Sequence, residues 1–416
     1  MGATSVLGIF LITGSTGVVK AMVASTAYEA LRDYVFAVIP LFMLMGEFIG
    51  KSGAVTDLYA GINRALRRLP GRLALATVLG NAIFSFVTGV SIASAAAFSR
   101  IAYPQMRSYG YDHGFALGAV AGSSCLGMLI PPSVLMIVWG ILTEQSIGRI
   151  FIAGILPGLL LVGLFLVYIV SVACLRPEKV GGGAPAPQLE ETVSAVSTGG
   201  MLSSVAGITL VVVAVLGGIW FGFFTPTEAA GVGALIALLL GLIKGMRWQA
   251  IVESILAVGR TSAPILLLLL TAALYSRVLA MTGVSSAIQN LFLESGLAPW
   301  QILAVMVLVW FLLGTVIDSI SIMLLTVPIF APMAATLGFN PIAFAIIGIL
   351  AIEAGLLTPP FGLLVYTVKA AIRDDDVSIG RIFASAAPYW LIILLAMIAI
   401  ARFPSIATAL PDMAYN

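Results

Sequence analysis

Long apolar stretches of helical length are the feature of this sequence that most constrains its fold. Seven stretches carry little or no charge: Phe36–Gly50, Ile150–Cys174, Met201–Phe224, Pro226–Ile243, Pro264–Tyr275, Trp300–Val316 and Tyr389–Ala401. A membrane-spanning helix needs about 20 mostly apolar residues, whereas a barrel strand needs about ten residues of alternating polarity. Hydrophobic residues make up 61% of the chain and charged residues only 9%, far from the usage of soluble domains. We therefore predict an all-α polytopic membrane protein.

A double proline occurs twice in this apolar chain, at Pro131–Pro132 and again 228 residues later at Pro359–Pro360. The same offset relates three further pairs: Ser91 and Ser319, Gly127 and Gly355, and Pro104 and Pro332. The hexapeptide SIGRIF occurs at 146–151 and again at 378–383. Recurrence of this kind indicates an internal repeat.

The repeat divides the chain into three parts. A first repeat covers 1–175, a linker rich in Gly, Pro and Ser covers 176–200, and a second repeat covers 201–416. Each repeat is expected to contain a re-entrant helical hairpin and then a helix broken at the double proline. We place these elements at about 73–104 and 112–145 in the first repeat, and at about 299–333 and 340–372 in the second.

The two repeats are predicted to have inverted topology. We expect five crossings in the second half, and an odd number turns one half upside down relative to the other. The segment 64–72 before the first hairpin carries four arginines, whereas 293–300 before the second carries no Lys or Arg. By the positive-inside rule, the first hairpin enters from the cytoplasm and the second from outside. The counterpart of Met201–Phe224 would precede residue 1, so one N-terminal helix is expected to be missing.

The double prolines are predicted to mark a binding site. A proline inside a helix costs about 3 kcal/mol, and the backbone groups that it frees must be satisfied when the surroundings are apolar. Breaks of this kind are tolerated where backbone lines a cavity and binds ions. A kink without function is the alternative, but two matching Pro-Pro pairs, each with a glycine four residues earlier, favour a site.

Polar residues in the two hairpins complete the predicted site. The first hairpin carries Thr88, Gly89, Ser91 and Ser94, and the second carries Thr315, Asp318, Ser319 and Ser321. Their hydroxyls and the nearby carbonyls are hard oxygen donors, which suit sodium. Asp318 is expected to face a cavity or cation, or else to cap the following helix. Glu353 is either buried and functional or close to the membrane interface.

Other function classes have little support. The formal net charge is only +2, and no basic cluster with interleaved aromatic residues indicates nucleic-acid binding. No nucleophile–base pair or metal-ligand cluster occurs at a usable spacing, so we do not expect an enzyme. The chain has a single histidine, which leaves little basis for a proton relay.

The chain resembles the DctM family, the large membrane subunit of tripartite ATP-independent periplasmic (TRAP) transporters. Six stretches carry the resemblance, in order along the chain: IPLFMLMGEFIGKSG (39–53), GYDHGFALGAVAGSSCLGMLIPPSVLMIVWG (110–140), SIGRIFIAGILPGLLL (146–161), FFTPTEAAGVGAL (223–235), GTVIDSISIMLLTVPIFAP (314–332) and EAGLLTPPFG (353–362). Together they extend over nearly the whole chain.

The resemblance implies an elevator-type, sodium-driven importer of a small organic acid such as a C4-dicarboxylate or sialic acid. It implies two partners in a bacterial inner membrane system, a small four-helix DctQ-type subunit and a periplasmic DctP-type binding protein. Carried over by position, the expected sodium-binding residues are Gly89, Ser91, Gly127, Pro131, Asp318, Ser319, Gly355 and Thr358. The expected substrate-binding residues are Ser94, Pro132, Ser321 and Pro360.

Two alternative functions stay open at the level of sequence. A stand-alone sodium/dicarboxylate or ion symporter with the same inverted-hairpin architecture would transport substrate without a binding protein. A membrane scaffold or channel would be indifferent to a sodium gradient. The identity of the transported carboxylate cannot be derived from these residues.

Overall fold

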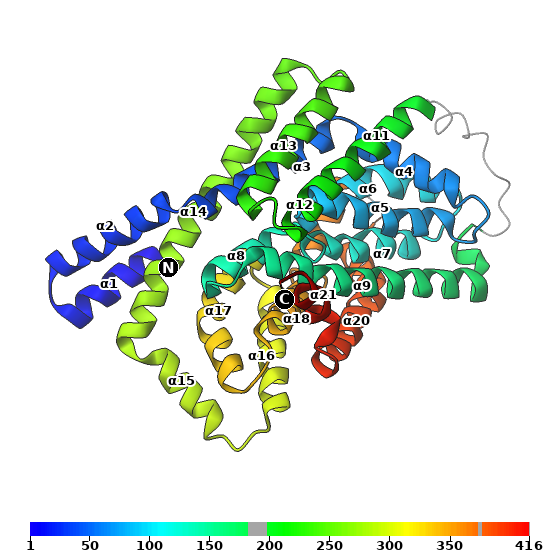
Figure 1. Ribbon diagram of the computed structural model, residues 1–416. Coiled ribbons are helices and arrows are strands. Elements are labelled where there is room, and N and C mark those ends of the chain that lie inside the picture. The colour runs from blue at the N-terminus through cyan, green and yellow to red at the C-terminus, as the bar shows by residue number, and fades with distance from the viewer. Residues whose placement is uncertain (182–197, 373–376, 416) are drawn as a thin grey trace.

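The computed structural model describes residues 1–181, 198–372 and 377–415 of the chain (Figure 1). Within these ranges the regular elements are helices, and strand pairing is limited to an isolated bridge between Tyr111 and Val180. Most of the expected linker 176–200 lies outside the described residues. Its start forms the short 3-10 helix η3 (Pro177–Lys179), and its last residues begin α11 (Thr198–Val212). The predicted all-helical class is confirmed.

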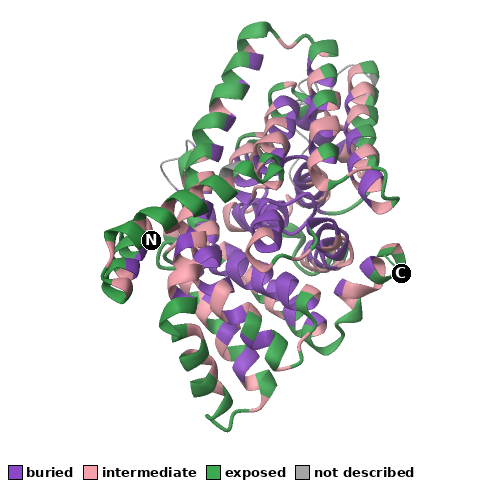
Figure 2. Cartoon of the chain, turned by 60° about the vertical axis from the view of Figure 1, so that its left-hand side comes forward, coloured by how far each residue is buried: buried purple, intermediate pink, exposed green. Residues whose placement is uncertain are grey.

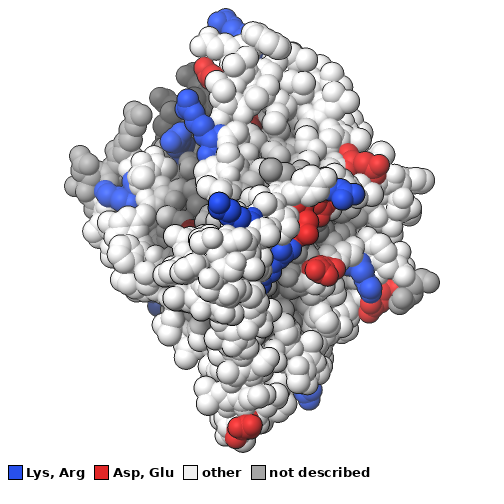
Figure 3. Space-filling view, turned by 90° about the vertical axis from the view of Figure 1, so that its left-hand side faces the viewer, with Lys and Arg blue, Asp and Glu red and all other residues white. Residues whose placement is uncertain are grey.

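Helices long and apolar enough to cross a membrane occur along the whole chain. Seven such segments are found among the described residues: Tyr34–Lys51, Ile147–Leu175, Gly199–Trp220, Pro226–Ile243, Trp248–Thr282, Ser319–Thr336 and Ile379–Arg402. The surface in Figure 3 is consistent with this, because charged side chains form small groups on a largely uncharged face. The chain is a multi-span membrane protein.

One side of the molecule is built on the 35-residue helix α14 (Trp248–Thr282). The N-terminal helices α1 (Gly2–Thr13) and α2 (Thr16–Arg32) pack against it, and α15 (Val284–Leu293) continues the chain beyond it (Figure 1). In the sequence, the amphipathic stretch Trp248–Val258 favours a helix lying in the membrane interface, and the apolar stretch that begins at Pro264 favours a separate span. Instead, α14 continues through Pro264. In apolar surroundings, ending the helix would leave more backbone groups unpaired than the single N–H that proline lacks.

A second group of helices lies beside α14. It consists of α3 (Val38–Lys51), which follows η1 (Tyr34–Ala37), α4 (Ala54–Ala65), α11 (Thr198–Val212), α12 (Gly218–Trp220) and α13 (Pro226–Ile243). Helix α3 packs against α13 and α14, and α4 packs against α11. At the start of α13, Thr225 and Glu228 form a capping box, so the Thr-Pro-Thr-Glu sequence sets where this helix begins.

Two helical hairpins and two broken helices lie deeper in the molecule. The hairpins are α5 (Arg72–Thr88) with α6 (Ser91–Ser108), and α16 (Pro299–Gly314) with α17 (Ser319–Thr336). The broken helices are α7 (His113–Ser124), η2 (Cys125–Met128) and α8 (Val134–Thr143), and α18 (Pro341–Gly355) and α19 (Leu363–Ala371). The side chains of Asp112 and Asn340 cap α7 and α18, respectively. Buried residues are concentrated in the middle of the molecule, whereas the helices around the N-terminus are largely exposed (Figure 2).

Both copies of the SIGRIF hexapeptide lie at the start of a helix. They begin α9 (Ile147–Leu175) and α20 (Ile379–Arg402), where Ser146 and Ser378 cap the helix. The arginine of each copy forms an ion pair with a different element. Arg149 lies 3.5 Å from Asp412 of α21 (Ser405–Tyr415), and Arg381 lies 3.6 Å from Asp112.

Candidate functional site

The tip of the first hairpin lies against the first helix break. Helix α5 ends at Gly89, whose φ of 61° is in the left-handed region that glycine tolerates best. The amide of Val134 donates to the Gly89 carbonyl at 3.2 Å. A side chain at Gly89 would collide with the carbonyl oxygen of Pro132. Glycine is thus required here for both its backbone angle and its close approach to the double proline.

The 3-10 segment η2 packs just as closely on the residue after this tip. A Cβ atom at Gly127 would lie 2.7 Å from Cα of Ser91. The Ser91 hydroxyl is 3.5 Å from the Cys125 carbonyl oxygen. The backbone of η2 therefore packs against Ser91 on one side, and Ser91 is fully buried.

The second hairpin tip meets the second break in a related way. The amides of Phe361 and Gly362 donate to the Thr315 carbonyl at 3.0 and 3.3 Å. A Cβ atom at Gly355 would lie 2.7 Å from Cα of Gly314, so the two helices touch through glycines. The peptide bonds Pro131–Pro132 and Pro359–Pro360 are both cis.

Asp318 lies at the second tip and caps α17. Its carboxylate accepts a hydrogen bond from the Ser321 amide at 3.0 Å, and the side chain is exposed. It also borders a hollow of about 350 Å³ between Gly314–Asp318 and the residues after the double proline. The two interpretations of Asp318 are thus compatible: it caps a helix and faces a cavity.

Glu353 joins the two hairpin tips. Its carboxylate accepts a hydrogen bond from the Ser91 hydroxyl at 2.6 Å through one oxygen, and from the Ser319 hydroxyl at 3.5 Å through the other. The side chain is only 1% exposed. The sequence alone does not assign a role to Glu353, because no local pattern shows that residues 262 positions and 34 positions away face one carboxylate. A lone acid in a fully apolar helix was the only signal.

The remaining expected site residues lie around these contacts. Thr358 donates from its hydroxyl to the Gly355 carbonyl at 2.8 Å. Ser94 is buried on α6, and its hydroxyl has no hydrogen-bond partner among the residues that the structure describes. Pro131 and Pro132 are buried, Ser321 is half-buried, and Pro359 and Pro360 are exposed. The structure therefore brings Ser91 and Ser319 together at Glu353 and packs Gly127 against Ser91, but no contact of Ser321 or Pro360 with Glu353 is found among the described residues.

A larger hollow of about 550 Å³ lies beside the first tip. Thr88, Val90 and Ile92 of the first tip line it together with residues of α3 and α14. Each tip therefore borders a cavity as well as a helix break. Within the described residues, no group of three or more His, Cys, Asp or Glu side chains could hold a metal ion. The tips and breaks present hydroxyl and carbonyl oxygens, which are the kind of donor that binds sodium.

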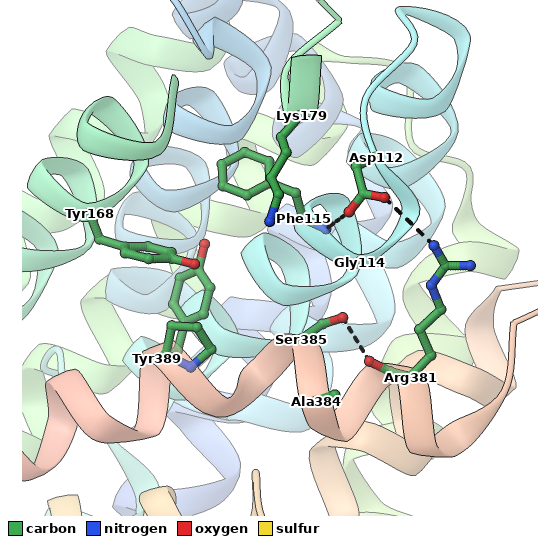
Figure 4. A pocket seen from close by; sticks show the side chains of 10 residues that line it. Asp112, Gly114, Phe115, Tyr168, Lys179, Arg381, Ala384, Ser385 and Tyr389 are labelled. Atoms are coloured by element: carbon green, nitrogen blue, oxygen red, sulfur yellow. Dashed lines mark hydrogen bonds and ion pairs between the residues drawn. The ribbon is translucent and has the colours of Figure 1, made fainter. Parts of the chain in front are cut away.

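A third hollow, of about 270 Å³, lies beside the starts of α7 and α20 (Figure 4). Asp112 and Arg381 pair across it, while Lys179, Tyr168 and Tyr389 face it from the other side. The amide of Asp112 donates to the Lys179 carbonyl at 3.0 Å. This hydrogen bond attaches the start of the linker 176–200 to the turn before α7. The third hollow is therefore a site separate from the contacts at Glu353.

Comparison with known proteins places these features in a family. Residues 1–406 match the family described as the DctM component of the tripartite ATP-independent periplasmic transporter. The C4-dicarboxylate TRAP transporter large permease protein DctM of Pseudomonas aeruginosa is 33% identical over 92% of this chain and 88% of its own length. The sialic acid TRAP transporter large permease protein SiaM of Vibrio cholerae is 27% identical over 98% of this chain and 92% of its own.

A solved structure has a similar fold. The YdaH transporter of Alcanivorax borkumensis aligns with a TM-score of 0.68, covering 96% of this chain and 89% of that one. The two sequences are only 14% identical, so the similarity concerns the helical membrane fold alone.

Proposed function

Because the chain belongs to the DctM family of TRAP transporter large permeases, we propose that it carries out sodium-coupled uptake of a small carboxylate. Membership makes the chain a transporter permease and not an enzyme. In this proposal a periplasmic DctP-type protein delivers the substrate, a small DctQ-type subunit completes the membrane complex, and the complex lies in a bacterial inner membrane. Named relatives transport C4-dicarboxylates and sialic acid, and both kinds of solute carry a carboxylate.

The observation that carries the proposal is the meeting of four separate segments in one buried region. Both hairpin tips and both helix breaks converge there, and Glu353 contacts both tips. Irregular backbone in a membrane protein is tolerated where it is buried in protein or lines a cavity, and it then supplies oxygen ligands for ions. This arrangement supports a transport site better than a scaffold, which would have no need of broken helices.

We assign the sodium ions to two half-sites. The first uses oxygens around Gly89, Ser91 and Gly127–Pro131. The second uses oxygens around Asp318, Ser319, Gly355 and Thr358. Each half-site combines a hairpin tip with a helix break, so movement of either element changes the ligand set.

The substrate carboxylate is assigned to the neighbouring positions Ser94, Pro132, Ser321 and Pro360. Helices α6 and α17 begin at Ser91 and Ser319, so both direct their N-terminal ends toward this region. A helix N-terminus carries partial positive charge and favours an anion. The buried, unpartnered hydroxyl of Ser94 adds a hydrogen-bond donor on α6.

Transport in this proposal follows an elevator mechanism. The two hairpins and broken helices, related by the 228-residue offset as inverted repeats, form the moving part. Helices α3, α4, α11, α13 and α14, with the N-terminal pair, form the frame. The hollow of about 550 Å³ lies between α6 and the frame helices α3 and α14, where the two parts would slide past one another.

Reconstitution tests the proposal directly. The chain and its small partner subunit are placed in proteoliposomes, and uptake of a radiolabelled dicarboxylate or sialic acid is measured with and without the binding protein and an inward sodium gradient. Uptake that requires both supports the proposal. Uptake by the chain alone would favour a stand-alone symporter, and uptake indifferent to sodium would remove the coupling mechanism.

A further inference from the structure

The carboxylate of Glu353 is buried, and it forms no ion pair with a Lys or Arg among the residues that the structure describes. Burial of an isolated carboxylate costs several kcal/mol even after relaxation, so the surrounding groups must compensate for it. The compensating groups in the structure are the hydroxyls of Ser91 and Ser319.

The two serines add more than hydroxyl groups, because each is the first residue of an 18-residue helix. The partial positive charges at the N-terminal ends of α6 and α17 therefore lie next to the same carboxylate. Val90, which precedes α6, provides no side-chain cap, and the Glu353 carboxylate lies at that end through its hydrogen bond from the Ser91 hydroxyl. The carboxylate is thus stabilised by two helix ends that belong to different hairpins.

Each oxygen of Glu353 is engaged by a different hairpin. Oε2 accepts a hydrogen bond from the first tip, and Oε1 accepts one from the second. Because both oxygens belong to one carboxylate, a movement of one hairpin that carries its oxygen along also moves the oxygen bound to the other hairpin. The acid itself lies on α18, two residues before the glycine that packs on Gly314. A displacement of one tip is therefore transmitted to the second tip and to the second break.

We propose that Glu353 is a positioning residue that holds both hairpin tips in one geometry and so makes the two sodium half-sites fill cooperatively. This inference rests on the proposed sodium coupling. Sodium at one tip orders that tip and, through Glu353, the other. The second ion then binds to a half-site that is already ordered, so its binding involves a smaller loss of conformational entropy.

The test is a sodium titration of uptake in proteoliposomes that contain the complete complex. Wild-type protein is expected to show a Hill coefficient between 1 and 2. Glu353→Ala removes both hydrogen-bond acceptors, so the Hill coefficient of this variant should fall to about 1. Its half-saturating sodium concentration should rise about tenfold, a change that corresponds to an ordinary coupling free energy between two sites. Glu353→Gln keeps the size but replaces one acceptor with a donor, so it should give intermediate values. Glu253→Gln, an exposed carboxylate in a surface ion pair, serves as the control.

A distance measurement keeps the inference testable if Glu353→Ala does not transport. Spin labels are placed at Ile92 and Ile320, one residue beyond each serine, with the exposed Cys174 replaced by serine. We expect one narrow distance distribution in the otherwise wild-type complex and a clearly broader one with Glu353→Ala. Unchanged width would overturn the proposed positioning role.

The outcomes separate this inference from the function on which it rests. Wild-type uptake that depends on sodium with a Hill coefficient of 1 would overturn the cooperativity and leave sodium coupling standing. The same holds if Glu353→Ala keeps the wild-type coefficient. Wild-type uptake without any sodium dependence would overturn both.

Discussion

Asp318 shows how one side chain at a hairpin tip can serve both folding and binding. Its carboxylate caps α17 through the Ser321 amide, and it borders the hollow at the second tip. The cap requires only an oxygen acceptor, which asparagine supplies about as well as aspartate. A sodium half-site would in addition use the negative charge. The two roles can therefore be separated by one pair of variants.

We expect Asp318→Asn to keep the thermal stability of the protein and to raise the half-saturating sodium concentration for uptake several-fold. Asp318→Ala should also lose the cap, at a cost of about 1 kcal/mol, and should unfold at a lower temperature. Thermal unfolding in detergent and sodium titration of uptake check the two effects. Wild-type sodium dependence in Asp318→Asn would reduce Asp318 to a helix cap.

Helix starts could be predicted from the sequence where the signal was local. Asp112 and Asn340 precede helices as good capping residues, and the structure places each of them at a helix start. The role of Glu353 could not be derived in this way. Its two partners lie on α6 and α17, and their position against α18 depends on helix packing that no short motif encodes.

At the scale of elements, a three-residue cluster ties α4, α11 and α13 together. Asp57 of α4 forms an ion pair with Lys244, which follows α13, and the Ser204 hydroxyl of α11 donates to Asp57 at 2.8 Å. The side chains of Lys244 and Asp57 are only 13% and 17% exposed. Removal of one partner would leave the other charge partly buried, which costs far more than the loss of a surface pair.

Lys244→Met is therefore expected to destabilise the protein by about 2 kcal/mol, below the range for fully buried pairs because some solvent reaches the cluster. The matched control is Lys51→Met, which breaks the more exposed pair with Glu253 and should cost at most about 1 kcal/mol. Both are measured as shifts in thermal unfolding, with uptake as the second readout. Equal shifts would show that the cluster does not hold these helices together.

Element boundaries were easiest to predict where Pro, Gly or a capping residue interrupts an apolar run. The end of α5 at Gly89 and the start of α18 after Asn340 are examples. Helix α14 differs, because the charged residues before Pro264 suggested an interfacial segment and the proline suggested a break. Local propensity favoured two helices there, but the cost of unpaired backbone in an apolar environment favours one.

At the scale of the whole molecule, the proposed function requires the hairpins to move against the frame. Ala97 of α6 and Ala257 of α14 line the same hollow from the two sides. A covalent link between them would prevent such movement. This requirement gives a test that needs no assumption about ligands.

With cysteines at Ala97 and Ala257 and Cys174 replaced by serine, a short bifunctional thiol reagent should abolish uptake, and a reductant should restore it if the linker is reducible. Each single cysteine should transport normally after the same treatment. The control pair Ala93 and Ala97 lies on one helix and should tolerate cross-linking. Full uptake by the Ala97–Ala257 cross-linked complex would contradict movement of α6 past α14.

The pairing of both tips with Glu353 also bears on how alike the two halves of the chain are. The residue 228 positions before Glu353 is Cys125, whose thiol carries no carboxylate and whose backbone carbonyl, rather than its side chain, approaches Ser91. One half thus furnishes the acid for both. A molecule built from two copies of the second half would place two carboxylates close together in one buried region. A molecule built from two copies of the first half would have no carboxylate to accept hydrogen bonds from the two serines. The two halves therefore differ in their chemistry at this matched position.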